Sequence, residues 1–166
     1  AGFAGEALPR AVFSSVIGRQ RKGYARVMTP RGDEREWFAG AEAQSRRGIL
    51  TLEFPIERGV GSSWDDMERL WRHAFCNELR LDGVASRDVL LTESLAAPRA
   101  NRERIASIFF KTLDARAIRV ANTSVLALHA SGVGAGATGW AIEGTGLVVS
   151  SGDSLPTAVP VYAGCP

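Results

Sequence analysis

The chain has 166 residues, of which 45% are hydrophobic and 23% charged, with a formal net charge of +2. This composition is typical of a folded globular protein and excludes a disordered tail, and no apolar run approaches the ~18 residues of a membrane helix. The near balance of charges gives no reason to expect nucleic acid or an anionic membrane as partner. We expect Cys76 and Cys165 to be reduced thiols, because nothing marks them as a disulfide or metal framework.

The first predicted strand covers residues 10–17, where β-branched and apolar residues lie between Pro9 and Gly18. In residues 19–37, six basic residues are interleaved with acids, glycine and proline, and the few apolar residues have no sustained period. We interpret this segment as an exposed loop. Its aromatic residues permit stacking of nucleic-acid bases, but its acidic residues favour a solvated or protein-binding loop.

The next elements are a short helix and a strand, followed by the clearest helix of the chain. Residues 42–47 form one or two predicted helical turns, and residues 48–55 a strand that ends at the proline. The clear helix begins after Ser63, its predicted N-cap. His73 lies beside its apolar stripe and is interpreted as a packed or solvated side chain. The stripe itself consists of Trp64, Met67, Leu70, Trp71, Ala74 and Phe75.

The second half of the chain alternates between strands and helices. Residues 88–93 are nearly all apolar, as in a strand that is buried on both faces. Pro98 and Asn101 open a helix, and a strand at residues 117–121 and a helix at residues 123–130 follow. This alternation predicts an α/β layer with at least some parallel pairing. The predicted buried side of the helix that Pro98 opens carries Ile105, Ile108, Phe109 and Thr112.

The C-terminal region is rich in glycine and small residues. Residues 134–139 match the dinucleotide-binding pattern GxGxxG, which requires a turn that leaves a strand and enters a helix. Here a helix precedes the pattern and a strand follows it, so we interpret it as a flexible connector. In residues 145–164 two predicted strands flank a tight turn at residues 150–154. Its backbone N–H groups suit a phosphate site, and an ordinary hairpin turn is the equal alternative.

Several segments, in one order along the chain, resemble actin and the actin-related proteins. They are residues 2–5, 9–13, 42–52, 55–57, 64–68, 77–80, 89–93, 100–103, 130–132 and 151–153. The resemblance covers nearly the whole chain, which is similar to less than half of an actin, the two smaller subdomains of its N-terminal side. On this basis we expect residues 1–18 and 49–166 to form a small outer core subdomain, with residues 19–48 as an inserted subdomain that carries an exposed basic loop.

The resemblance implies an α/β fold of the ribonuclease-H-like type, a mixed sheet with flanking helices, here in partial form. It also implies ATP binding in a cleft between two halves of the family fold. The basic loop corresponds to the actin loop that grips the next subunit of a filament, and the region around His129 to part of a groove for binding proteins. The residues implied to bind partners are Arg21, Lys22, Tyr24, Arg26, Met28, His129, Ala130 and Gly132.

The second phosphate loop of the family survives in outline. The family's first phosphate loop is expected before Ala1 and is not part of this sequence. In the second loop, Ser150 stands in place of the leading aspartate and Ser154 in place of the closing glycine. Serine carries no formal charge to hold hydrated Mg²⁺. The remnant that could still meet phosphate is Ser150, Ser151, Gly152, Asp153 and Ser154.

Two further positions depart from the family at the site of ATP hydrolysis. Thr123 corresponds to the glutamine that positions the attacking water, and Thr157 to the histidine near that water. Because orienting the nucleophile is a main protein contribution to phosphoryl transfer, we expect no catalytic residues, no metal site and no ATP turnover. Arg58 also replaces a histidine, and residues 134–144 resemble an insertion.

Two functions follow from the resemblance. The first, which we favour, is a degenerate actin-like structural or interaction subunit of a larger cytoskeletal or actin-related assembly, without a nucleotide cofactor. The alternative is an ATP-binding filament subunit, an ATPase using ATP or ADP with Mg²⁺, of which this chain is one piece. The preserved Gly152 and Asp153 favour the alternative.

The expected partners are other protein subunits, actin or actin-related proteins among them, rather than a membrane or nucleic acid. A family sheet without its first strand and its C-terminal helices exposes unpaired edges and apolar faces. We therefore expect other subunits to cover these surfaces. The expected location is the cytoplasmic cytoskeleton, with the nucleus as the alternative.

Overall fold

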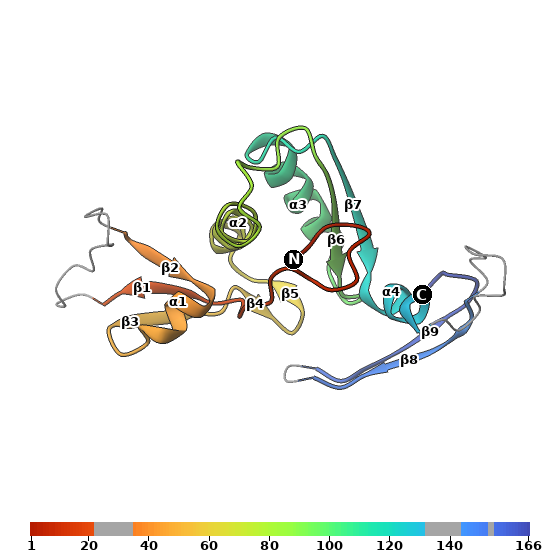
Figure 1. The fold of residues 1–166 in the computed structure, drawn as a ribbon. Coiled ribbons are helices and arrows are strands. Elements are labelled where there is room, and N and C mark those ends of the chain that lie inside the picture. The colour runs from red at the N-terminus through yellow and green to blue at the C-terminus, as the bar shows by residue number, and fades with distance from the viewer. Residues whose placement is uncertain (22–34, 132–143, 153–154) are drawn as a thin grey trace. The chain divides into compact units, whose positions relative to one another are not determined.

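The computed structural model describes residues 1–21, 35–131, 144–152 and 155–166 (Figure 1). The chain divides into two compact units. Unit 1 comprises Ala1–Ile56 and Gly61–Val84, and unit 2 comprises Glu57–Val60 and Ala85–Pro166. Both helices and strands occur in each unit, and the fold is mixed α/β, as predicted.

Unit 1 contains a three-stranded antiparallel sheet in the order β2-β1-β3. Its strands are β1 (Ile17–Gln20), β2 (Trp37–Ala39) and β3 (Leu50–Glu53). The prediction of a strand at residues 10–17 is wrong, because the strand begins where that range ends. Residues 10–16 instead pack irregularly, and the amide of Ala11 donates a hydrogen bond of 3.0 Å to the carbonyl of Ala1.

Gly18 explains the misplaced first strand. The sequence suggested that this glycine ends the strand, but it lies within β1, where it pairs with Phe38 and Leu52. A Cβ atom at this position would lie 2.7 Å from Cδ1 of Leu50 and 3.2 Å from Cβ of Ala43. Glycine is therefore required here because neighbouring side chains pack against the strand backbone.

The predicted loop at residues 19–37 is shorter at both ends, because Arg19 and Gln20 belong to β1 and Trp37 begins β2. The predicted helix at residues 42–47 is found as α1 (Gly40–Ser45), and β3 lies inside the predicted strand at residues 48–55. Two short strands that the sequence did not predict, β4 (Ile56–Glu57) and β5 (Val60–Gly61), pair with each other.

The clear helix is confirmed, but it consists of two kinds of helix. α2 (Trp64–Arg72) is α-helical, and η1 (His73–Glu78) continues it as a π-helix. Ser63 precedes the first turn as predicted, although its hydroxyl group donates to Oδ2 of Asp66 at 3.1 Å and does not cap a backbone amide. Leu70 of α2 packs on Ile17 and Ala39 of the sheet, so the predicted apolar stripe forms part of the core of unit 1.

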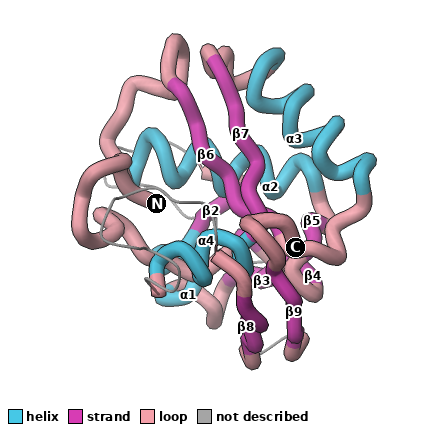
Figure 2. Tube along the Cα trace, turned by 90° about the vertical axis from the view of Figure 1, so that its right-hand side faces the viewer, coloured by secondary structure: helices cyan, strands magenta, loops and turns pink. Residues whose placement is uncertain are grey.

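The longer segment of unit 2, Ala85–Pro166, begins with a strand–helix–strand motif (Figure 2). β6 (Asp88–Glu93) and β7 (Ala117–Asn122) pair in parallel, and α3 (Arg99–Lys111) connects them and packs against β7. This confirms the predicted alternation and parallel pairing.

The prediction that both faces of this strand are buried is wrong. Val89 and Leu91 are half-buried, whereas Leu90 on the other face is exposed. Because the residues of this run are nearly all apolar, the sequence did not indicate that buried and exposed side chains alternate along it. The prediction for α3 also needs a correction at its end, since Phe109 is fully buried but Thr112 is exposed and follows the last helical residue.

The C-terminal part of unit 2 contains a helix and a hairpin. α4 (Thr123–Ala130) directly follows β7, and β8 (Gly146–Ser150) pairs with β9 (Thr157–Val161) in an antiparallel hairpin, as predicted. Leu128 of α4 packs against Val159 and Val161 of β9. The glycine pattern at residues 134–139 lies outside the described residues.

Two general predictions concern the surface of the chain. Cys76 and Cys165 are both exposed and unbridged. Among the described helices, none has the length and apolar character to cross a bilayer; α3, for example, has 13 residues.

Candidate functional site

The carboxyl ends of β6 and β7 lie together in unit 2, where Glu93 pairs with Asn122 in the strand register. Ligand sites of α/β proteins form at this end of parallel strands, because the loops that leave the strands meet there. The side chain of Asn122 accepts a 2.8 Å hydrogen bond from the amide of Ser124 and so caps α4. An asparagine between a strand and an apolar helix is the sequence signal for this cap, and our sequence reasoning missed it.

Glu93 is a buried carboxylate at this edge, and it also escaped the sequence reasoning. Its Oε1 accepts a 2.6 Å hydrogen bond from Nε of Arg102 and a second one from the Nη2 group of that arginine. This hydrogen bonding and the negative charge of Glu93 raise the pKa of Arg102. The charge of Glu93 is therefore compensated, and the pair joins β6 to α3.

The remnant of the predicted phosphate loop lies at the turn of the hairpin. Ser150 ends β8 and pairs in register with Thr157, which begins β9. Ser150, Ser151 and Gly152 are exposed residues. Asp153 and Ser154 lie outside the described residues. The structure thus brings together Ser150 of β8 and Thr157 of β9, two of the positions at which the sequence is expected to depart from the actin pattern.

Thr123, the third replaced position, is the exposed first residue of α4. The helix that it begins packs on the hairpin through Val125 and Leu128, further along the helix. Thr123 therefore directly follows the carboxyl end of β7, where Asn122 pairs with Glu93, and it brings a hydroxyl group to the start of a helix.

The described residues of this site do not fit a hydrated magnesium ion. Mg²⁺ bound with a nucleotide is usually held through one or two carboxylates. Ser150, Thr123 and Thr157 offer neutral hydroxyl groups, and the single carboxylate nearby among the described residues, Glu93, binds Arg102 through Oε1 while its Oε2 is buried without a hydrogen-bond partner. In the described ranges, no three His, Cys, Asp or Glu side chains are grouped closely enough to share a metal ion. The exposed residues Ser151 and Gly152 remain compatible with contact to a phosphate group.

The residues predicted to bind partners are only partly described. Arg21 is exposed directly after β1 in unit 1, and His129 and Ala130 are exposed at the end of α4 in unit 2. The structure describes these two groups in different units and does not place them on one surface. The other predicted residues lie outside the described ranges: Lys22, Tyr24, Arg26, Met28 and Gly132.

A second charged cluster, in unit 1, has a structural role. The Asp66 side chain is 1% exposed, and its Oδ1 lies 2.5 Å from Nη2 of Arg19 and 2.8 Å from Nη1 of Arg69. Burial alone raises the pKa of Asp66, but hydrogen bonds from Arg69, Ser63 and Arg19 outweigh this effect and lower it. Because Arg19 lies in β1 and Asp66 in α2, the cluster holds the sheet to the helix.

The mixed α/β fold agrees with what a comparison with known families shows. The model of the family described as Actin matches residues 1–166, which is the full length of the sequence. The antiparallel sheet of unit 1, the parallel strand pair β6–β7 and the β8–β9 hairpin all lie within the matched range. The chain belongs to the actin family.

Proposed function

We propose that this chain is a structural and interaction subunit of a larger actin-type assembly that does not turn over ATP. The carrying observation is an exposed apolar face on the β8–β9 hairpin. Leu147 and Val149 are 64% and 68% exposed, and their partners across the hairpin, Pro160 and Ala158, are exposed as well. These four side chains form a contiguous apolar patch, because they occupy neighbouring register positions on one face.

The opposite face of the same hairpin is also apolar. Val148, Val159 and Val161 pack there with Leu128 of α4. A strand pair with two apolar faces is typical of the interior of a protein, and soluble monomers rarely leave such a face in water. If another protein subunit covers the patch, both apolar faces of the hairpin are shielded from water. Actin and the actin-related proteins are the expected class of partner, in the cytoplasmic cytoskeleton or in the nucleus.

The proposal of no ATP turnover is supported by the chemistry of the replaced positions. Ser150 and Thr157, which pair across the hairpin, bring neutral hydroxyl groups to the phosphate-loop remnant. In the described part of this loop, no side chain is a carboxylate that could steer magnesium and none is placed to orient water, so these residues offer little differential stabilisation of a transition state. The exposed residues Ser151 and Gly152 allow weak phosphate contact at most.

The patch is tested by the double substitution Leu147→Thr with Val149→Thr, which keeps β-branched or strand-compatible residues at both sites. We expect the purified wild-type chain to sediment as associated species, and the double variant to sediment near the 17.8 kDa monomer with an unchanged circular dichroism spectrum. Val12→Thr removes another exposed apolar group and serves as the control. A wild-type chain that is a cooperative monomer contradicts the proposal.

ATP turnover is tested by titrating the purified chain with labelled ATP and Mg²⁺ and by measuring phosphate release. We expect no tight saturable binding and no release above the rate without protein, because the described hydroxyl groups do not replace a magnesium-steering carboxylate. A complete actin, assayed in parallel, verifies the conditions. Tight binding with turnover would establish the alternative, an ATP-binding filament subunit.

A further inference from the structure

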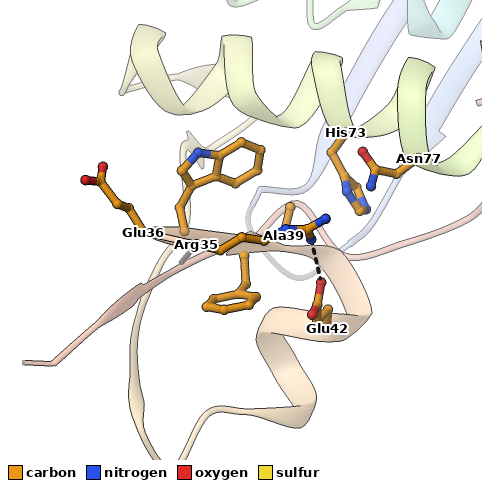
Figure 3. A pocket seen from close by; sticks show the side chains of 8 residues that line it. Arg35, Glu36, Ala39, Glu42, His73 and Asn77 are labelled. Carbon is orange, nitrogen blue, oxygen red and sulfur yellow. Dashed lines mark hydrogen bonds and ion pairs between the residues drawn. The ribbon is translucent and has the colours of Figure 1, made fainter. Parts of the chain in front are cut away.

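Two polar side chains that line a cavity in unit 1, Glu42 and His73, already contact other residues of the chain (Figure 3). The cavity has a volume of about 360 Å³. Both carboxylate oxygens of Glu42 form ion pairs, with Arg35 at 3.5 Å and with Arg46 at 3.1 Å. Nε2 of His73 has almost no accessible surface and lies 3.1 Å from Oε1 of Glu78. The cavity therefore offers neither side chain to a ligand.

The strand pair β6–β7 of unit 2 is covered by α3 on one face and is exposed on the other (Figure 1). Successive side chains of a strand point to opposite faces, and burial alternates accordingly. The half-buried side chains share one face: Val89, Leu91, Ile118 and Val120. The exposed side chains share the other: Asp88, Leu90, Thr92, Ala117 and Arg119. Because parallel strands are normally covered on both faces, this second face lacks a covering element among the described residues.

Leu90 and Arg119 lie side by side at the centre of the exposed face, since they are partners in the parallel register. Leu90 is 58% exposed. Within the described ranges, the guanidinium group of Arg119 has no ion pair or hydrogen bond, although the residue is exposed. Asp88 on the same face is paired with Arg116, with 2.6 Å between Oδ2 and Nη2. The face thus presents one free positive charge beside an apolar side chain.

The shape and charge of this face fit an α-helix that carries an acidic residue. Ala117 and the half-buried Ala121 precede and follow Arg119 on the same face, and these small side chains allow a partner to approach β7 closely. Helices are the elements that cover parallel strands in α/β proteins. The apolar stripe of an amphipathic helix matches Leu90, and a carboxylate beside that stripe matches the guanidinium group of Arg119.

We infer that the exposed face of β6–β7 binds an amphipathic helix of a partner protein, and that an acidic side chain beside the apolar stripe of this helix pairs with Arg119. A second copy of the chain that packed through the same face would bring the two Arg119 side chains together, and their like charges oppose this contact. The face shares no residue with the hairpin patch, so it is a second interaction surface that goes beyond the proposed function.

The test uses the full chain with Leu147→Thr and Val149→Thr, so that the hairpin patch does not contribute. The probes are three fluorescein-labelled peptides of about 18 residues, long enough to form a helix in water. They consist of alanine, glutamine and one leucine stripe, and they differ at one position beside the stripe, which is glutamate, glutamine or lysine. We expect saturable binding by fluorescence anisotropy, about tenfold tighter for the glutamate peptide than for the lysine peptide, with the glutamine peptide between them.

Three substitutions locate the contact. Arg119→Glu should reverse the order, so that the lysine peptide binds most tightly. Arg104→Glu makes the same change in net charge on α3 and should leave the order unchanged. Leu90→Thr keeps a residue that suits a strand and should weaken all three peptides alike. Circular dichroism verifies that each variant is folded.

Equal binding of the glutamate and lysine peptides, or an unchanged order after Arg119→Glu, overturns the inference. Binding that occurs with the wild-type chain but is lost in the hairpin variant also overturns it, because the helix then binds the hairpin patch of the proposed function. A single-stranded oligonucleotide that displaces the glutamate peptide through Arg119 would assign the face to nucleic acid instead. Sedimentation of the wild-type chain as a monomer contradicts the proposed function but does not change the expected order of the peptides.

Discussion

Replacing Phe109 with alanine is expected to lower the free energy of unfolding of unit 2 by about 3–5 kcal/mol. Phe109 is 0% exposed in α3, the helix that connects β6 with β7. Truncating its ring removes buried apolar area and leaves a cavity that the surrounding backbone can fill only in part. Urea denaturation, followed by circular dichroism, measures the loss.

The neighbouring Phe110 provides a matched control, because it lies in the same helix and is 47% exposed. Phe110→Ala has the same helix-propensity change and should cost much less, about 1 kcal/mol or below. Equal losses for the two variants would show that α3 does not bury the side of the helix that the structure assigns to the core.

Asp66→Asn is expected to lower the free energy of unfolding of unit 1 by about 2 kcal/mol. The substitution keeps the side-chain volume but removes the charge that Arg19 and Arg69 share in the cluster between β1 and α2. The loss stays below that of a fully buried ion pair, because both arginine side chains remain 35% exposed and water screens them. Asp65→Asn changes an exposed neighbour and should have little effect.

The effect of Asp66→Asn should also depend on pH. The pKa of Asp66 in the folded chain lies below its ordinary value of 3.8, so its ionised form stabilises the fold at neutral pH. This stabilisation is lost as the pH falls from 3.8 through the folded pKa, because the unfolded chain binds the proton at a higher pH than the folded chain does. The difference between wild type and variant should shrink over that range, and a constant difference would exclude ionisation as its cause.

The elements of unit 2 follow from local sequence signals. Asn122 lies between a β-branched strand and an apolar helix, and both elements, β7 and α4, occur as predicted. The first strand was misplaced because Gly18 ends a strand by propensity, whereas its role depends on Leu50, which is distant in the sequence. The strand propensity of a residue does not indicate a packing contact with a residue that is distant in the sequence.

The candidate site shows the same limit. The pairing of Ser150 with Thr157 follows from a short hairpin and was accessible from the sequence. The partner of Glu93 was not, because Arg102 meets it only after α3 folds back beside β6. The π-helical geometry of η1 was not predicted either, because the sequence offers no recognised signal for it. Long-range packing decides both features.

Pro160 limits how copies of the hairpin could associate through their edges. It lies within β9, and proline has no N–H group to donate, so in a ladder its nitrogen faces the outer side. A further strand cannot form a complete ladder on that side. Another strand can then pair with this hairpin only along β8. If the β8 edges of two copies pair with each other, no free edge remains and association stops at a dimer, whereas two free edges on each copy would permit an unlimited fibril.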